Sequence, residues 1–130
     1  MSMSDSLSAA FSKILNAEKS VKREVEIKNY SKLLKEILDI YKDLGYIGSY
    51  NEVEKETGQV LVINLLGNIN KCGSVRPRFP VKSNDIVKFE KRYLPSRNVG
   101  KLIISTPKGL MTHNQAKDEK TGGILLSYVY

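Results

Sequence analysis

The sequence has little of the chemistry that most catalytic and metal sites need. Its 130 residues include one cysteine, one histidine and no tryptophan. The single cysteine, Cys72, permits no intramolecular disulfide, so we expect a cytoplasmic protein. A metal site would need more ligands than Cys72 and His113 supply, and we expect neither a metal nor a cofactor.

Long apolar runs are also missing. The longest, such as residues 60–63, are far too short to cross a bilayer, and the first residues lack the order of a secretory signal. A hydrophobic content of 41% is enough for a packed core, and no low-complexity tract indicates disorder. We therefore expect one domain, or two small subdomains sharing a core, with no membrane partner.

Positive charge is in excess, and it is concentrated in one segment. Residues 67–108 hold ten basic and two acidic side chains, a net charge of +8, whereas residues 1–66 hold nine and ten, a net charge of −1. Such a field attracts a polyanion, most commonly nucleic acid, although a well-solvated basic surface is an alternative. Charge alone does not distinguish RNA, DNA and anionic lipid.

The first half of the chain, residues 1–66, is predicted to form an N-terminal α/β subdomain. Ser4 or Asp5 would cap the first helix, and Ser31 would cap the second, which would end at Gly45. The predicted elements are a helix over 7–15, a strand over 23–28, a helix over 32–44, and strands over 46–54 and 59–66.

The second half, residues 67–130, is predicted to be mostly antiparallel β structure with short helices. The fold class is thus α+β. Thr112 and Gln115 fit a capping box that opens a helix, which Gly122 and Gly123 would end. The predicted elements are a helix over 84–92, a strand over 101–106, a helix over 113–120 and a strand over 124–130.

The stretch STPKG (105–109) places two hydroxyls, a cation and a glycine at a strand end. Ser105 and Thr106 could contact a base, sugar or phosphate, with Lys108 adding charge and Gly109 allowing close approach. An equally good interpretation is a turn whose hydroxyls satisfy their own backbone.

Enzymatic interpretations are weaker. Ser105, His113 and Asp118 supply the residue types of a hydrolase triad, but no Gly-x-Ser-x-Gly surrounds the serine. A lone histidine at a helix start is usually a surface residue. The aromatic residues Phe79, Phe89 and Tyr93 lie among the basic residues and could either stack on bases or form the core.

Several runs together resemble one family, the eighth protein of the small ribosomal subunit. They are NINKCGSVRPRFPV (68–81), LPSR (94–97), STPKGLMTH (105–113) and TGGILLSYVY (121–130), with support from 14–18, 31–33 and 45–48 in the first half. The runs at 76–79 and 94–97 resemble the archaeal and eukaryotic branch. The resemblance covers essentially the whole chain.

The resemblance implies a structural RNA-binding protein of the ribosome without catalytic activity. Its partners would be the central domain of small-subunit rRNA, bound during assembly, and neighbouring ribosomal proteins, but not DNA. Translational autoregulation occurs in some bacterial members of the family. The implied fold is two packed α+β subdomains, and the C-terminal one carries the main RNA contact. A non-ribosomal, protein-binding scaffold is the alternative.

The resemblance also suggests which residues meet RNA. Ser105, Thr106 and Pro107 match the hydroxyl-rich loop of the family, although Pro107 removes the third hydroxyl and a backbone N–H. Ile124 stands where many bacterial members place a glutamate that touches RNA. The expected RNA-binding residues are Ser105, Thr106, Lys108, Gly122, Gly123, Arg76, Arg78, Lys91, Arg92, Arg97, Ser31 and Lys32.

Overall fold

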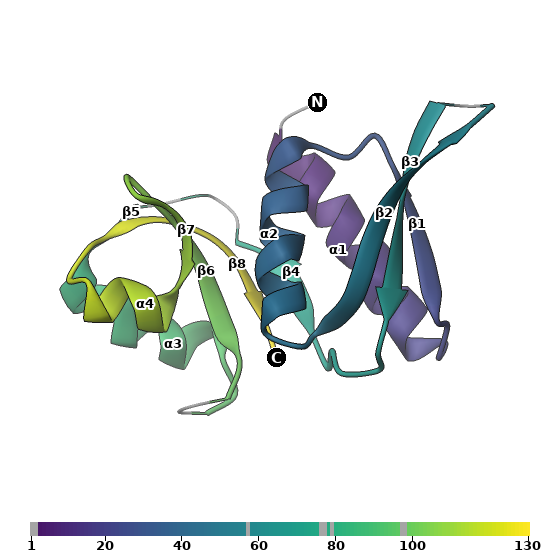
Figure 1. The fold of residues 1–130 in the computed structure, drawn as a ribbon. Coiled ribbons are helices and arrows are strands. Elements are labelled where there is room, and N and C mark those ends of the chain that lie inside the picture. Colours follow the sequence, from purple (N-terminus) through teal and green to yellow (C-terminus); the bar gives the residue numbers. More distant parts are fainter. Residues whose placement is uncertain (1–2, 57, 76–77, 79, 97–98) are drawn as a thin grey trace. The chain divides into compact units, whose positions relative to one another are not determined.

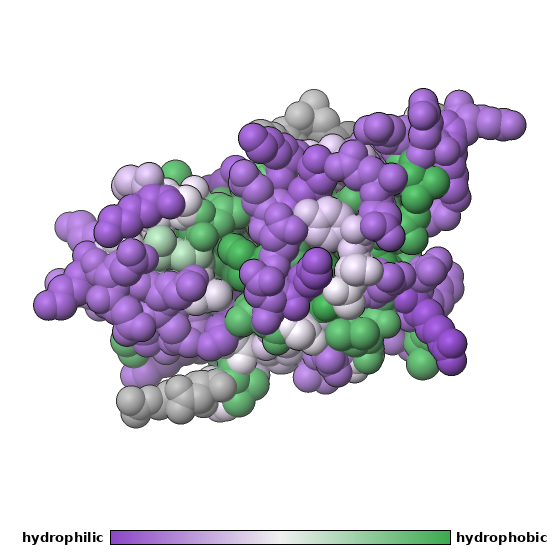
Figure 2. Space-filling model, viewed as in Figure 1, coloured by the Kyte–Doolittle hydropathy of each residue, from purple (hydrophilic) through white to green (hydrophobic). Residues whose placement is uncertain are grey.

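The computed structural model describes residues 3–56, 58–75, 78, 80–96 and 99–130. The chain divides into two compact units, which we call unit 1 (Met1–Asn70) and unit 2 (Lys71–Tyr130) (Figure 1). Both units combine helices with antiparallel strands, so the predicted α+β class is confirmed. Hydrophilic side chains cover most of the face seen in Figure 2. Among the described residues, every helix is too short or too polar to span a bilayer.

Unit 1 is a three-stranded antiparallel sheet in the order β1-β3-β2, with two helices on one face (Figure 1). The predicted succession of helix, strand, helix, strand and strand is confirmed. Its elements are α1 (Met3–Lys19), β1 (Glu24–Lys28), α2 (Lys32–Asp43), β2 (Ile47–Lys55) and β3 (Gly58–Leu65). The crossover through α2 therefore joins the two strands that flank β3.

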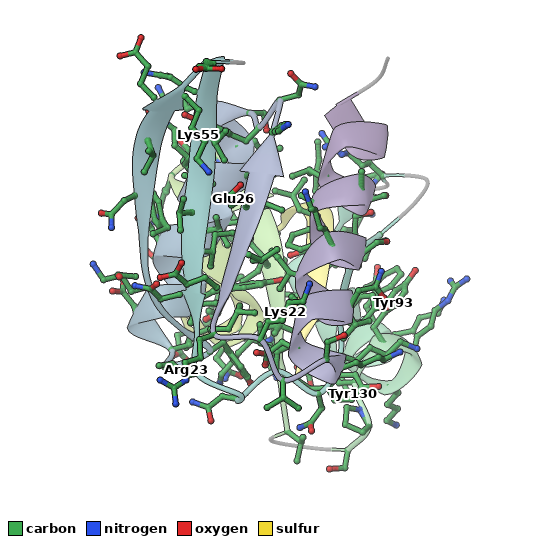
Figure 3. All side chains as sticks on the ribbon, turned by 90° about the vertical axis from the view of Figure 1, so that its right-hand side faces the viewer. Lys22, Arg23, Glu26, Lys55, Tyr93 and Tyr130 are labelled. Carbon is green, nitrogen blue, oxygen red and sulfur yellow. The ribbon has the colours of Figure 1, made fainter. Side chains whose placement is uncertain are left out.

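The strict alternation of β1 gives the strand one buried and one exposed face. Val25 and Ile27 are buried, whereas the residues between and beside them are exposed. On the exposed face, Lys55 of β2 forms an ion pair with Glu26 of β1 (Figure 3). The hydrogen bond from Lys55 lowers the pKa of the Glu26 carboxyl below its ordinary value. Both side chains are well exposed, so the pair adds little stability.

Helix α2 begins and ends where its sequence signals predict. The Ser31 hydroxyl accepts a hydrogen bond from the Leu34 N–H at 3.2 Å, and Gly45 follows the helix with a φ of +83°. Its buried face includes Tyr41, whose ring stacks on Phe11 of α1 with 6.0 Å between centroids. The predicted cap of α1 is wrong, because that helix begins at Met3 and already includes Ser4 and Asp5.

Unit 2 contains a five-stranded antiparallel sheet centred on β8. β4 and β5 pair with one edge of β8, β6 pairs with the other edge, and β7 pairs with the far side of β6. Its elements are β4 (Cys72–Ser74), β5 (Pro80–Val81), η1 (Ser83–Asp85), α3 (Ile86–Tyr93), β6 (Lys101–Thr106), β7 (Gly109–Thr112), α4 (His113–Asp118) and β8 (Gly123–Val129). The short strands β4, β5 and β7 were not predicted.

The core of unit 2 lies between this sheet and its helices. Phe89 and Tyr93 pack against the core while remaining half-buried, so for Phe89 the core interpretation is the better one. The buried members of the core are Val75, Val81, Ile86, Leu94, Leu102, Ile104, Met111, Ala116 and Leu125.

Helix α4 opens as predicted but ends differently. Thr112 and Gln115 form the capping box, in which the Thr112 hydroxyl accepts from the Gln115 N–H. The helix ends at Asp118, and Lys120 adopts the left-handed backbone conformation with a φ of +53°. The glycines expected to end it serve strand packing instead. A Cβ on Gly122 would lie 2.4 Å from the Val81 carbonyl oxygen, and one on Gly123 would lie 2.0 Å from that of Ser105.

These backbone positions predict opposite effects of two substitutions. Lys120→Gly should raise the free energy of unfolding by about 0.5–1 kcal/mol, because glycine adopts positive φ without strain. Gly123→Ala should lower it by at least about 2 kcal/mol, because the added methyl group collides with backbone. Urea denaturation of the three proteins measures both effects. A stable Gly123→Ala variant would mean that β8 does not approach β6 this closely.

Candidate nucleic-acid interface

The tip of the β6–β7 hairpin is closed by the Thr106 side chain. Thr106 pairs with Gly109 across the turn, and Pro107 and Lys108 are the two turn residues. The Thr106 hydroxyl donates to the Gly109 carbonyl at 2.8 Å and accepts from the Lys108 N–H at 3.2 Å. The side chain is only 8% exposed. The local geometry of Thr106 is therefore that of a turn-forming hydroxyl.

Ser105 occupies the adjacent, half-buried position and lies between two strands. It pairs with Leu110 of β7 and with Ile124 of β8. In the part of the chain that the structure describes, its hydroxyl has no hydrogen-bond partner. Of the two hydroxyls expected to meet RNA, that of Ser105 is thus the one available to a ligand.

The two expected glycines, Gly122 and Gly123, lie at the start of β8, beside Ser105 and β5. Gly123 lies against the Ser105 carbonyl, and Gly122 lies against Val81 at the end of β5. Ile124 is 44% exposed beside Ser105. The rim of the site is therefore apolar at this position and offers no carboxylate to a donor group.

Lys108 projects from the hairpin tip as a cation. Its Nζ lies 3.5 Å from Glu119 Oε1, and the two side chains are 63% and 42% exposed. A surface pair of this kind contributes between about 0 and 1 kcal/mol, so a phosphate can readily displace the carboxylate.

The other expected cations differ in what the structure shows. Arg78, Lys91 and Arg92 are exposed on unit 2. Arg76 and Arg97, like Phe79, lie outside the described residues. Ser31 and Lys32 belong to unit 1, where the Ser31 hydroxyl caps α2 and Lys32 is exposed in its first turn.

The geometry around His113 excludes the hydrolase alternative. The imidazole is buried, contrary to the expectation of a surface histidine, because α4 packs on β6. Its Nδ1 accepts the Leu102 N–H at 3.1 Å, so a neutral ring carries its proton on Nε2, which lies 3.5 Å from Glu90 Oε1. Because the Nδ1 lone pair accepts the Leu102 N–H and Nε2 carries the proton, the neutral ring has no free lone pair with which to activate Ser105.

Burial of the ring also changes its protonation. Desolvation lowers the pKa of His113 to about 4, against a smaller opposing effect of the Glu90 carboxylate. Glu90 is itself ion-paired with Lys117. His113 is therefore neutral at physiological pH. Its Nδ1 accepts the hydrogen bond of the Leu102 N–H in β6.

A comparison with protein families decides the identity of the chain. The family model described as Ribosomal protein S8 matches residues 5–130. The chain belongs to the ribosomal protein S8 family. As an S8 protein it is a structural component of the small ribosomal subunit that binds rRNA and other ribosomal proteins, and it is not an enzyme. The resemblance drawn from the sequence is thus confirmed over nearly the whole chain.

In this S8 protein, Thr106→Val should act on stability. The valine keeps the β-branched shape but removes both turn hydrogen bonds, so the free energy of unfolding should fall by about 1–2 kcal/mol. Denaturant titration of the variant and the parent checks this. An unchanged unfolding midpoint would show that the two bonds contribute nothing to the turn.

His113→Asn should remove a pH dependence of stability. The folded pKa of about 4 lies below the unfolded value of 6.5, so between these values only the unfolded chain binds the proton. The parent should therefore lose on the order of 2–3 kcal/mol of stability as the pH falls from 7 to 4, beyond the loss in the variant. The asparagine can still accept the Leu102 N–H. Parallel slopes of unfolding free energy against pH would contradict this.

Proposed function

We propose that this S8 protein binds the central domain of small-subunit rRNA during assembly, with unit 2 as the primary contact. The observation that carries the proposal is the separation of charge between the units. Unit 2 holds twelve basic and four acidic residues, a net charge of +8, whereas unit 1 holds nine and ten, a net charge of −1. A polyanion is therefore attracted to unit 2 and not to unit 1.

Two kinds of contact follow from the chemistry of unit 2. Exposed cations such as Arg78 and Lys108 bind phosphates and position the RNA without reading its sequence. The Ser105 hydroxyl can donate to or accept from an unpaired base or a ribose 2′-OH, and it thereby distinguishes one RNA structure from another. We assign phosphate binding to the exposed cations and recognition of the RNA structure to Ser105 at the end of β6.

The N-terminus of α2 supplies a further backbone contact in this proposal. Ser31 uses its hydroxyl for the cap, so the contribution to RNA comes from the free N–H groups of the first turn and from Lys32. This contact would add affinity without sequence preference. If the protein also regulates its own synthesis from a cytoplasmic mRNA, that mRNA must present the same structure to Ser105.

Ser105→Ala should weaken rRNA binding without lowering stability. Removing the hydroxyl leaves a desolvated RNA group without a partner, a loss of roughly 1–3 kcal/mol, or one to two decades in Kd. The slope of log Kd against log salt should stay at the parental value, because no counterion is released. Filter binding to the rRNA fragment that the protein protects from nuclease measures both quantities.

Arg78→Gln is the matched comparison for the Ser105 variant. It should weaken binding to all RNAs alike and reduce the salt slope by about 0.7–0.9 if Arg78 lies on a phosphate. Binding of heparin as tight as that of the protected fragment would instead support a general basic scaffold. The central-domain assignment fails if the protected fragment maps elsewhere in the rRNA.

A further inference from the structure

Three tyrosines and one arginine form a row on unit 2 that is separate from Ser105. The Tyr93 and Tyr128 rings stack with 5.6 Å between centroids and 23° between planes, and Tyr128 and Tyr130 stack at 6.5 Å and 25°. The Arg92 guanidinium lies 5.6 Å from the Tyr93 centroid. Tyr93 and Tyr130 lie on the same side of unit 2 (Figure 3). We call these four residues the tyrosine row.

Two glycines make room for the tyrosine row. A Cβ on Gly73 would lie 2.8 Å from Tyr128 Oη and 3.0 Å from Tyr128 Cζ, so that ring lies directly against the backbone of β4. Gly100 has a φ of +86°, and a Cβ there would lie 2.7 Å from Tyr130 Cβ. The middle ring of the row, Tyr128, and the Cβ of its last residue, Tyr130, therefore lie where a side chain at Gly73 or Gly100 would collide with them.

A purely structural role explains only part of this arrangement. The rings do pack against the core of unit 2, but all three remain half-buried rather than buried. Tyr130 ends the row, and among the described residues Tyr128 is its only ring partner. A flat, partly exposed aromatic surface is thus left at the end of a stack whose other end carries a cation.

The charges beside the tyrosine row are positive. Arg92 covers one end, and Lys71 pairs with Tyr130 through two backbone hydrogen bonds of 2.8 and 2.9 Å. Lys91 is exposed next to Arg92. The carboxylate nearest in sequence, Glu90, is ion-paired with Lys117. Half-buried rings flanked by cations match an unpaired nucleotide, which offers a π face and a phosphate together.

We propose that the tyrosine row is a second RNA contact, at which an unpaired base stacks on Tyr130 while Arg92 and Lys71 hold neighbouring phosphates. The proposal rests on the rRNA binding proposed above and extends it to a stacking interaction. Tyr130 directly follows β8 and continues its extended pairing, so its spacing of two from Tyr128 places both side chains on one face.

The decisive experiment compares two substitutions at Tyr130 in the full chain, with a control substitution at Tyr50 and the nuclease-protected rRNA fragment as probe. Tyr130→Leu removes the ring and should weaken Kd about 5- to 100-fold, while Tyr130→Phe keeps the ring and should bind like the parent. The salt slope should not change in either variant. Tyr50→Leu makes the same change on unit 1 and should leave Kd at the parental value.

Tyr130→Trp tests stacking without removing the ring. Because the chain has no tryptophan, the new indole would be its only one, and an RNA base stacked on it should quench its fluorescence. We expect quenching that saturates with RNA binding, and a Kd equal to or tighter than that of the parent. Arg92→Gln should flatten the salt slope by about 0.7.

Several outcomes overturn the proposal. They are parental affinity in a folded Tyr130→Leu variant, equal losses in the Leu and Phe variants, and unquenched indole fluorescence at saturating RNA. Parental affinity combined with failure to enter the small subunit would identify the row as a protein contact instead. If Ser105→Ala weakens binding and Tyr130→Leu does not, only the stacking contact fails. If the parent does not bind rRNA, both proposals fail.

Discussion

Unit 2 depends on the close approach of β8 to the strands on both of its edges. The first residue of β8, Gly123, and the residue before it, Gly122, lie where a Cβ would collide with the carbonyl oxygens of Ser105 and Val81, respectively. Only glycine fits at these positions, so Gly122 and Gly123 allow β8 to pair with β5 and β6 from its first residues onward. Because the Ser105 carbonyl is held there, the position of the Ser105 side chain is set by the sheet rather than by a loop. A binding group on such a rigid element is placed more precisely than one on a mobile segment.

The positive field of unit 2 is strong because it has few acidic side chains and some of these already form ion pairs within the unit. Glu90 is paired with Lys117 and faces His113, and Glu119 lies beside Lys108. Two of the four acidic side chains of the unit are therefore engaged with cations of the unit itself. The remaining basic residues dominate the field that an approaching polyanion meets, which favours fast, salt-dependent association. Unit 1 contributes no such field, since its charges nearly cancel.

Local signals in the sequence predict much of unit 1 and less of unit 2. Helix α2 and strand β1 follow from apolar spacing, the Ser31 cap and Gly45, all of which act within a few residues. Strands β4, β5 and β7 are two to four residues long and exist only because β8 and β6 pair with them, so no periodicity could reveal them. Lys120 was missed because a lysine in the left-handed conformation carries no sequence signature, whereas the glycines after it do.

The candidate site was predicted in part, for a similar reason. Their place at a strand end and the family resemblance grouped Ser105 and Thr106 as one site, but strand alternation and the turn give them different surroundings. The hydroxyl of Thr106 satisfies the backbone of the hairpin, and that of Ser105 does not. His113 was misjudged because its burial depends on how α4 packs against β6, a contact between segments that no local pattern encodes.

The closed turn at Pro107 has a thermodynamic consequence for recognition. Pro107 restricts one φ angle, and the Thr106 hydroxyl ties both sides of the turn together. The conformational entropy of this hairpin tip is therefore lost when the chain folds and not when a partner arrives. Association at the tip should then require little ordering of the protein, and the entropy lost on binding falls mainly on the ligand.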